Sequence, residues 1–324
     1  MTSKNDESCT ACHDCICPNC FHADAPVGAC AWNGAEDEMV FHDVSSALRK
    51  VLAPAVGAGE KAVVAARAVD EHVARPVTWR EGRVAGLYTR RFGPWPSRGA
   101  VVVLVHGLGL SGRYFTPLAR SLAAAGRTVL VPDLPGSARS RRAVRRTPAV
   151  EEAAETLLRW QTAAAIGPCV WVANSVGCQT TAALAADHPH LVQRMVFIGP
   201  ALDATALSPA RQLLRLLADA PREPPSLLAL AAADYLVTGA GRFLAMFHQA
   251  QQDAAGPFVV RLGQIEVPTL VLRGSKDRVA PQPWAEHVCT GLLDGRLAVV
   301  SGAAHAVHFS RPDTTARQIL QFLQ

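Results

Sequence analysis

Three residues of this sequence have the types that nucleophilic catalysis requires. Ser175 lies in WVANSVGCQT, where an apolar stretch passes directly into a pattern that predicts a helix. Asp277 lies in RGSKDRVAP and His305 in SGAAHAVHF, and each follows another apolar stretch. A serine hydroxyl is a poor nucleophile until a neighbouring base removes its proton, and a carboxylate can orient that base. Each of these residues alone is more often structural, so a catalytic interpretation depends on their combination.

The elements that must position these residues alternate regularly along the chain. Continuous apolar runs predict buried strands, and helical patterns separate them. The strands are expected at 100–106, 127–133, 169–175, 191–200, 268–275 and 296–302, and the helices at 113–126, 148–165, 176–188, 283–292 and 313–324. A β-hairpin is expected before them, over 75–92. This alternation predicts the α/β class, with a mostly parallel sheet covered by helices on both faces.

Residues with functional chemistry follow several of the predicted strands. Ligands and catalytic groups gather at the carboxyl ends of strands in open α/β sheets. The segments that start there are HGLGLSG (106–112), DLPGSARS (133–140), ANSVG (173–177), RGSKDRVAP (273–281) and SGAAHAVHFSRP (301–312). In this order they resemble the α/β-hydrolase family, and the similarity extends over about residues 76–324.

The resemblance assigns a role to each of the three residues. It implies that Ser175 is the nucleophile on a sharp strand-to-helix turn, where crowding requires the small neighbours Ala173 and Gly177. The family usually has glycine at the position of Ala173. His305 is expected to be the general base, with His308 as the competing candidate, and Asp277 is expected to hold the imidazole. The order Ser, Asp, His along the chain is the order that this fold uses.

The same resemblance implies an oxyanion hole made by two backbone amides. Val176 N–H, at the start of a helix, is the expected first donor, and Leu108 N–H is the expected second. His106 and Gly107 are expected to support the loop that carries Leu108. Asp133 is expected to brace the DLPG turn without entering the chemistry.

Three regions are expected along the chain. Residues 1–74 form an N-terminal extension, with a Cys-rich segment at 1–35 and a helical region at 36–74, and residues 75–324 form the hydrolase domain. Helical stretches at 201–262 interrupt the alternation, and the resemblance identifies them as a cap over the pocket. The cap is rich in leucines, together with Tyr235, Phe243, Met246 and Phe247, which suits an apolar acyl or alcohol group or simple packing onto the core.

The Cys-rich segment is not part of the family pattern. Its candidate metal ligands are Cys9, Cys12, Cys15, Cys17 and Cys20. Dense thiolates in a reducing compartment predict zinc or another soft metal, while thiol-based regulation and the absence of any defined site stay open as alternatives. No cofactor is expected for catalysis.

Composition limits the other classes of function. The chain has 324 residues, of which 49% are hydrophobic and 18% charged, so a large folded core is expected. A net charge of +5 is weak evidence for nucleic-acid binding. No apolar run reaches the roughly 18 residues of a membrane span, and the N-terminus lacks a secretory pattern, so a cytoplasmic protein of unknown oligomeric state is expected. Five arginines within 139–146 predict a solvated loop or attraction of an anionic substrate.

These observations predict a serine hydrolase that cleaves a carboxylic ester or thioester of a small molecule through an acyl-enzyme. A serine at position 175 excludes the aspartate nucleophile of epoxide hydrolases and haloalkane dehalogenases on this scaffold. Two alternatives stay open. One is acyl transfer or cofactor-free perhydrolysis with the same triad, and the other is a metal-binding regulatory protein with a non-catalytic hydrolase fold.

Overall fold

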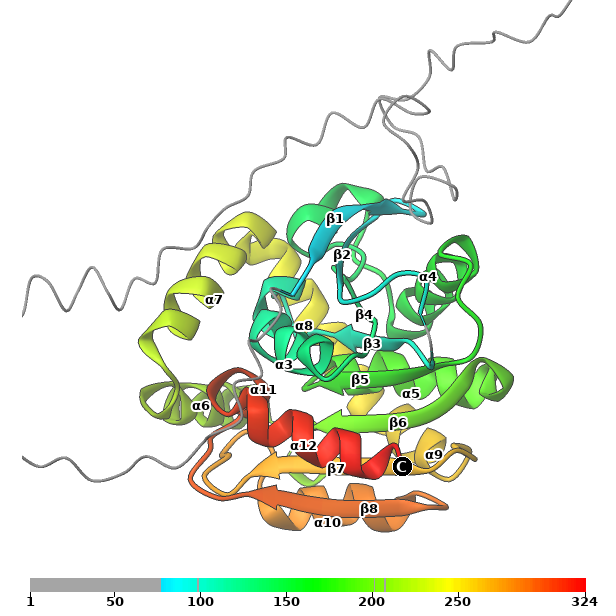
Figure 1. Ribbon diagram of the computed structural model, residues 1–324. Coiled ribbons are helices and arrows are strands. Elements are labelled where there is room, and N and C mark those ends of the chain that lie inside the picture. Colours follow the sequence, from blue (N-terminus) through cyan, green and yellow to red (C-terminus); the bar gives the residue numbers. More distant parts are fainter. Residues whose placement is uncertain (1–76, 98, 201, 207) are drawn as a thin grey trace, which may run out of the picture. The chain divides into compact units, whose positions relative to one another are not determined.

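The computed structural model describes residues 77–97, 99–200, 202–206 and 208–324 (Figure 1). The expected N-terminal extension, 1–74, lies outside the described residues. Its helical region at 36–74 and the candidate metal ligands Cys9, Cys12, Cys15, Cys17 and Cys20 are therefore predictions from sequence only.

The described chain is built on one eight-stranded sheet with the order β1-β2-β4-β3-β5-β6-β7-β8. Its strands are β1 (Trp79–Val84), β2 (Leu87–Phe92), β3 (Val102–Val105), β4 (Val129–Pro132), β5 (Cys169–Asn174), β6 (Val192–Ile198), β7 (Thr269–Gly274) and β8 (Gly295–Val300). β1 and β2 form the expected hairpin, and β2 is antiparallel to β4. All remaining pairs are parallel, so the predicted α/β architecture is confirmed.

Helices cover both faces of this sheet, because alternate residues of each buried strand point to opposite sides. α3 (Thr116–Ala124), α11 (Val307–Ser310) and α12 (Pro312–Phe322) cover one face, and α12 crosses in front of the sheet in Figure 1. α4 (Val150–Ala163), α5 (Gly177–Asp187), α9 (Pro257–Leu262) and α10 (Gln282–Gly291) cover the other. On β5, Val172 faces the first layer and Trp171 the second, and both are fully buried.

The insertion between β6 and β7 contains mainly α6 (Pro209–Asp219), α7 (Pro225–Thr238), α8 (Ala240–Ala254) and α9. α9 belongs to the core layer instead of the cap, because its fully buried Phe258 packs between Phe197 and Trp284. The region expected to be a cap therefore consists of α6, α7 and α8.

The cap leucines only partly line the interior. Leu227 is buried, whereas Leu213, Leu214, Leu217, Leu236 and Leu244 each expose more than half of their surface. These five do not form the expected apolar pocket lining. Inside the cap, Tyr235 and Phe243 pack edge to face with ring centroids 5.0 Å apart.

Among the described helices, none is by itself long and apolar enough to cross a membrane. The sharply bent pair α7 and α8 meets that test of length and composition only when the two are taken together.

Candidate active site

Ser175 lies at the turn between β5 and α5, and its backbone is in the left-handed region with φ of 59°. A residue with a side chain is strained there, at a cost of about 1–3 kcal/mol, and such strain persists where the surrounding structure imposes it. The Ser175 amide donates to Ile198 O at 3.0 Å, and the Cys178 amide donates to Ser175 O at 3.0 Å. The last residue of β6 and the first turn of α5 therefore fix this sharp reversal of the chain.

Small residues beside Ser175 let three backbone segments meet. A Cβ atom on Gly177 would lie 2.6 Å from His106 O, so no side chain fits between α5 and the end of β3. A Cβ atom on Gly107 would lie 3.0 Å from the Ser175 Cβ. The loop that carries Leu108 thus runs directly against the Ser175 turn.

The two amides expected to form an oxyanion hole flank this contact. Within the described part of the chain, neither Val176 N–H nor Leu108 N–H donates to a protein acceptor. Both residues line one small cavity together with Gly107. Two donors are therefore available close to Ser175.

Asp277 and His305 form a buried hydrogen-bonded pair. His305 Nδ1 lies 3.0 Å from Asp277 Oδ2. The other carboxylate oxygen, Oδ1, accepts the amides of Val279 and Ala280, each at 2.8 Å. These contacts leave Nε2 as the ring nitrogen of His305 that is not held by Asp277.

The electrostatic environment of His305 favours its protonated form. Burial by itself lowers the pKa of His305, but the carboxylate of Asp277 and, more weakly, those of Asp219 and Glu223 together raise the pKa to about 9. A neutral imidazole can act as a base, so this environment determines the pH range in which His305 can accept a proton.

The loops that carry Asp277 and His305 are joined to each other at the ends of β7 and β8. The amide of Lys276 donates to Ala303 O at 2.8 Å. A Cβ atom on Gly274 would lie 2.2 Å from Ala304 O, so the closeness of these loops requires glycine. The buried Arg273 side chain donates to Asp277 O and Ala280 O, which fixes the turn around the carboxylate.

Gly199 brings Ser175 and the Asp277–His305 pair to the same place. It follows Ile198, which accepts the Ser175 amide, and its φ is 51°. A Cβ atom on Gly199 would lie 2.9 Å from both Asp277 Oδ2 and His305 Nδ1. The structure therefore gathers Ser175, Asp277 and His305 around the end of β6.

His106 supports the Leu108 loop as a neutral ring. Its Nε2 accepts the Leu134 amide at 2.8 Å, so its Nδ1 carries the proton and donates to Gly107 O at 2.8 Å. Complete burial lowers the pKa of His106, which agrees with these hydrogen bonds.

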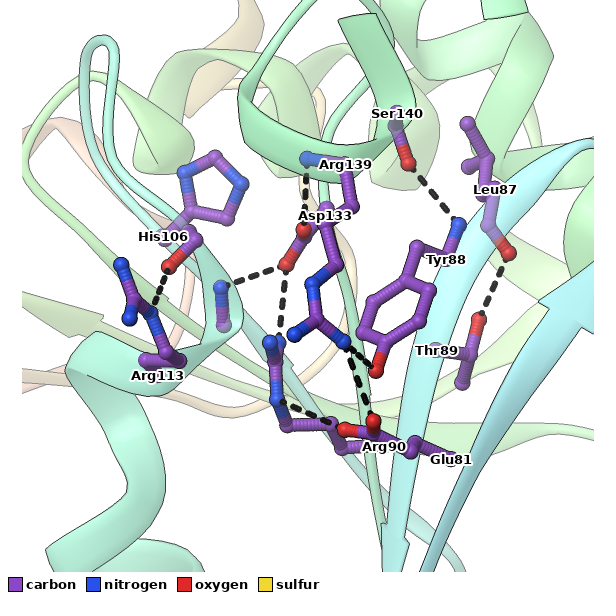
Figure 2. Close-up of polar contacts among 12 residues, drawn as sticks. Glu81, Leu87, Tyr88, Thr89, Arg90, His106, Arg113, Asp133, Arg139 and Ser140 are labelled. Carbon is purple, nitrogen blue, oxygen red and sulfur yellow. Dashed lines mark hydrogen bonds and ion pairs between the residues drawn. The ribbon is translucent and has the colours of Figure 1, made fainter. Parts of the chain in front are cut away.

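Asp133 lies at the centre of a second network, shown in Figure 2. Its Oδ1 accepts Arg90 Nη1 at 3.0 Å and the Gly112 amide at 2.7 Å, and its Oδ2 accepts the Arg139 amide at 3.3 Å. The carboxylate ties β2 to the loops after β3 and β4, and this is a bracing arrangement.

His308, the competing candidate base, lies inside an aromatic cluster. Its ring stacks on that of Phe115 with the ring centroids 4.2 Å apart, and it packs edge to face with the ring of Tyr114 with the centroids 4.3 Å apart. Burial lowers the pKa of His308 well below its usual value, and neither ring nitrogen has a partner among the described residues. This environment suits a packed neutral ring better than a base.

Two cap carboxylates near His305 are not predicted by the sequence pattern. Asp219 ends α6, and Glu223 follows the short helix Ala220–Arg222. Asp219 Oδ2 accepts the His305 amide at 3.2 Å, and Glu223 Oε1 accepts the Ala306 amide at 2.6 Å. No motif marks either residue, because they reach the site only through the path of the folded cap.

Two hollows adjoin the site. A cavity of about 50 Å³ is lined by Leu108, Val176, Met246 and mainly apolar neighbours from α4 and α8. A wider cavity of about 690 Å³ lies between Pro221–Arg222 and Ser275–Arg278. Its lining contains three cationic side chains, Arg222, Lys276 and Arg278.

The arginine-rich segment 139–146 is largely used within the protein. Arg139 pairs with Glu81, Arg141 donates to Val237 O on α7, and Arg146 pairs with Glu152. These contacts explain much of the cluster as attachment of a loop to β1, α4 and the cap.

Comparisons with known proteins agree with this architecture. The model of a family described as having the alpha/beta hydrolase fold matches residues 100–252. The magnesium-chelatase 30 kDa subunit of Rhodobacter capsulatus is 28% identical over 285 residues, which cover 78% of this chain and 98% of that protein. The 2-hydroxy-6-oxononadienedioate/2-hydroxy-6-oxononatrienedioate hydrolase 2 of Pseudomonas putida is 24% identical over 69% of this chain and 87% of its own. The enol-lactonase of Burkholderia xenovorans superposes with a TM-score of 0.61 at 21% identity, covering 75% of this chain and 99% of that one.

Proposed function

Since the chain is an α/β hydrolase, we propose that it is a serine hydrolase that cleaves a carboxylic ester or thioester of a small molecule. The observation that carries the proposal is the convergence at Gly199. The strained Ser175 turn and the hydrogen-bonded Asp277–His305 pair border the same short segment of backbone. Relatives named as hydrolases support the same class of chemistry.

In the acylation step, His305 Nε2 takes the proton of the Ser175 hydroxyl as its oxygen bonds to the substrate carbonyl carbon. The carbonyl electron pair moves onto oxygen, and the free amides of Val176 and Leu108 stabilise this oxyanion. Asp277, bonded to Nδ1, stabilises the imidazolium and does not itself take the proton. When the intermediate collapses, His305 gives its proton to the departing alcohol or thiol.

Deacylation repeats these steps with water as the nucleophile. His305 accepts a proton from water, the hydroxide oxygen bonds to the acyl carbon, and the proton returns to Ser175 as the acid leaves. Acyl transfer or perhydrolysis would differ only in the acceptor, which is an alcohol, amine or peroxide in place of water. Product analysis in water and in the presence of such acceptors separates these reactions.

The test is covalent labelling with a fluorophosphonate, followed by intact-mass measurement, because this probe reports an activated serine without assuming a substrate. We expect one adduct on the wild-type protein and none on Ser175→Ala. Asp277→Asn should label at a rate reduced by about 10⁴-fold, the size of effect expected for loss of a triad acid, and His305→Ala, which removes the base itself, should label more slowly still.

Two outcomes would contradict the proposal. An unlabelled wild type would mean that Ser175 is not activated, and an adduct that persists on Ser175→Ala would place the reactive group elsewhere. Asp133→Asn is the matched control, because Asp133 is also a buried carboxylate but is bonded to Arg90 and Gly112 instead of a histidine. This variant should lose stability and keep an activated serine.

The two hollows support a narrower substrate class. The cavity beside the two free amides holds only about 50 Å³, whereas small-molecule sites commonly measure about 300–1,000 Å³. The acyl group next to Ser175 is therefore expected to be short and apolar unless the cap moves. The wide cavity lined by Arg222, Lys276 and Arg278 favours an anionic group elsewhere on the substrate.

A second candidate function comes from the Rhodobacter capsulatus relative, whose match covers 98% of a protein named as a magnesium-chelatase subunit. This similarity favours a role beside a metal-handling enzyme, and the cysteines at 9, 12, 15, 17 and 20 are proposed ligands for zinc or another soft metal. Native mass spectrometry of reduced, anaerobically purified protein tests the metal. An unlabelled serine together with bound metal would favour this candidate over the hydrolase.

A further inference from the structure

The cap supplies two carboxylates that contact the backbone of both loops carrying the proposed base and acid. Asp219 Oδ1 accepts the Arg278 amide at 3.0 Å, one residue beyond Asp277, and Asp219 Oδ2 accepts the His305 amide at 3.2 Å. Glu223 Oε1 accepts the amide of Ala306 at 2.6 Å. Three amides beside Asp277 and His305 therefore have their acceptors on the cap.

The hydrogen bond between Asp219 and the His305 amide is buried, and those to the amides of Arg278 and Ala306 are partly buried. Asp219 is only 2% exposed and His305 only 7%. A buried amide that loses its acceptor incurs a desolvation penalty, so the loop would shift to find another partner or water. If the cap moved away, Arg278, His305 and Ala306 would lose these acceptors together.

We propose that Asp219 and Glu223 are positioning residues, which align the Asp277–His305 pair only while the cap is packed against the loops that follow β7 and β8. Closure of the cap then has two results at once: it encloses the substrate, and it brings Asp277 and His305 into alignment. Lids act in this way in other enzymes. This inference rests on the proposed serine hydrolase function, because alignment has a catalytic meaning only if His305 activates Ser175.

The charges of the two carboxylates add a second effect. Asp219 and Glu223 join Asp277 in favouring the protonated form of His305. Burial and the charge of Asp219 raise the pKa of Glu223 to about 7, although the Ala306 amide and His305 oppose this. The groups that face His305 are Asp277 after β7, the two cap carboxylates and His308 on α11, and Tyr114 lies beside the same carboxylates.

The variants can separate these two effects. Gln at position 223 keeps an acceptor for the Ala306 amide but removes the charge. Ala at position 223 removes the acceptor as well. Asn at position 219 can accept only one of the two amides that Asp219 now accepts.

The experiment measures the fluorophosphonate labelling rate of Ser175 from pH 5 to 10 in the wild type and each variant. Because a displacement near 1 Å can cost about 100-fold in rate, Asp219→Asn and Glu223→Ala should have a maximal labelling rate about 100-fold lower than the wild type, and, since each also removes a negative charge near His305, their half-maximal rate should occur at a lower pH. Glu223→Gln should keep the maximal rate, and its half-maximal rate should occur at a pH lower by about 1, since a nearby opposite charge shifts a pKa by about 1–3.

The matched control is Asp234→Asn. Asp234 is another buried cap carboxylate, but it pairs with Arg113 and contacts neither catalytic loop. It should leave both the maximal labelling rate and the pH of half-maximal labelling close to those of the wild type. If Asp234→Asn reproduces the behaviour of the 219 and 223 variants, or if those variants behave as the wild type, the positioning role is wrong.

A readout independent of catalysis completes the test. Hydrogen exchange of the peptide that contains His305 and Ala306 should accelerate in Glu223→Ala and not in Glu223→Gln. If the wild type does not label, the hydrolase proposal fails. If it labels but exchange at these amides is the same in all variants, only the positioning inference fails. Should Asp219→Asn not fold, the Glu223 variants still decide the outcome.

Discussion

Gly199 shows how little space separates the groups of the site. Its φ of 51° disfavours a side chain, and a Cβ atom would lie 2.9 Å from both His305 Nδ1 and Asp277 Oδ2. A side chain at position 199 would therefore have two unfavourable effects. The backbone is strained by any substituent, and the first atom added enters the hydrogen bond of the proposed base.

Gly199→Ala is accordingly expected to separate His305 from Asp277. The labelling rate of Ser175 should fall by at least about 100-fold, while the melting temperature falls by only a few degrees. Gly302→Ala is the control, since Gly302 also has a positive φ of 74° but has open space around its Cβ position. Equal labelling of Gly199→Ala and wild type would contradict this packing argument.

The environment of His305 also predicts the pH dependence of the enzyme. The base must be neutral, and the carboxylates around it raise its pKa to about 9, so labelling should increase with pH to a midpoint near 9. The raised pKa stabilises the fold fully below the unfolded pKa of about 6.5, and this stabilisation disappears as pH rises through 9. Labelling rates measured across pH 6–10 check the first prediction, and chemical denaturation over the same range checks the second. A midpoint near pH 6.5 in either measurement would contradict the raised pKa.

The pKa of His308 is shifted in the opposite direction to that of His305, and its effect on stability is therefore reversed as well. Burial among Phe115 and Tyr114 keeps it neutral with a lowered pKa, so the unfolded chain binds a proton that the folded protein does not. Stability should therefore decrease below about pH 6.5, by up to about 1.4 kcal/mol per pH unit. In His308→Phe this loss should be smaller, as measured by denaturation at pH 5 and 7. An unchanged difference between the two pH values would exclude His308 as its source.

At the scale of the elements, α8 limits the space beside the two free amides. Met246 on α8 lines the small cavity together with Leu108 and Val176, and its terminal methyl packs toward Gly136. The length of acyl chain that fits is therefore expected to depend on α8, together with the loop after β4 and α4, which also line this cavity.

Met246→Ala should widen this cavity and favour longer acyl groups. One methylene in an apolar pocket contributes about 1–3 kcal/mol, so the ratio of kcat/KM for butyrate over acetate esters should rise about tenfold. Leu244→Ala on the same helix is the control, because Leu244 is 62% exposed. A similar change in both variants would mean that loosening of α8, and not cavity volume, controls the preference.

At the scale of the whole molecule, three cations from separate segments converge on one hollow. Arg222 comes from the cap, and Lys276 and Arg278 flank Asp277. The Asp277 side chain itself is fully enclosed and paired with His305, so it does not neutralise this surface.

A substrate that carries a carboxylate should therefore bind better than a neutral one of equal length. Each exposed ion pair contributes up to about 1 kcal/mol, so KM should differ about fivefold at low salt and the difference should shrink in 0.5 M NaCl. Lys276→Ala should reduce the preference, whereas Arg296→Ala, a cation outside this hollow, should not. An equal KM for both esters at low salt would refute the anionic class.

The architecture follows from local features of the amino-acid sequence. Apolar runs long enough to be buried on both faces, separated by helical patterns, leave few arrangements other than a parallel sheet between two helical layers. The segments around Ser175, Asp277 and His305 are recognisable as strand ends, because glycine and small residues at fixed offsets from them meet a local requirement. Local patterns of this kind are visible in the chain without its fold.

Other features of the site depend on contacts between distant segments, which no local pattern contains. Asp219 and Glu223 lie more than eighty residues from His305 and Ala306 in the chain, and only the path of the cap brings them together. Contacts of this kind also determine that α9 packs on the core and that five cap leucines face outward, because helical periodicity does not specify which neighbour a helix will meet. Long-range hydrogen bonds and charges between such segments depend on the whole fold, and they set the basicity of His305.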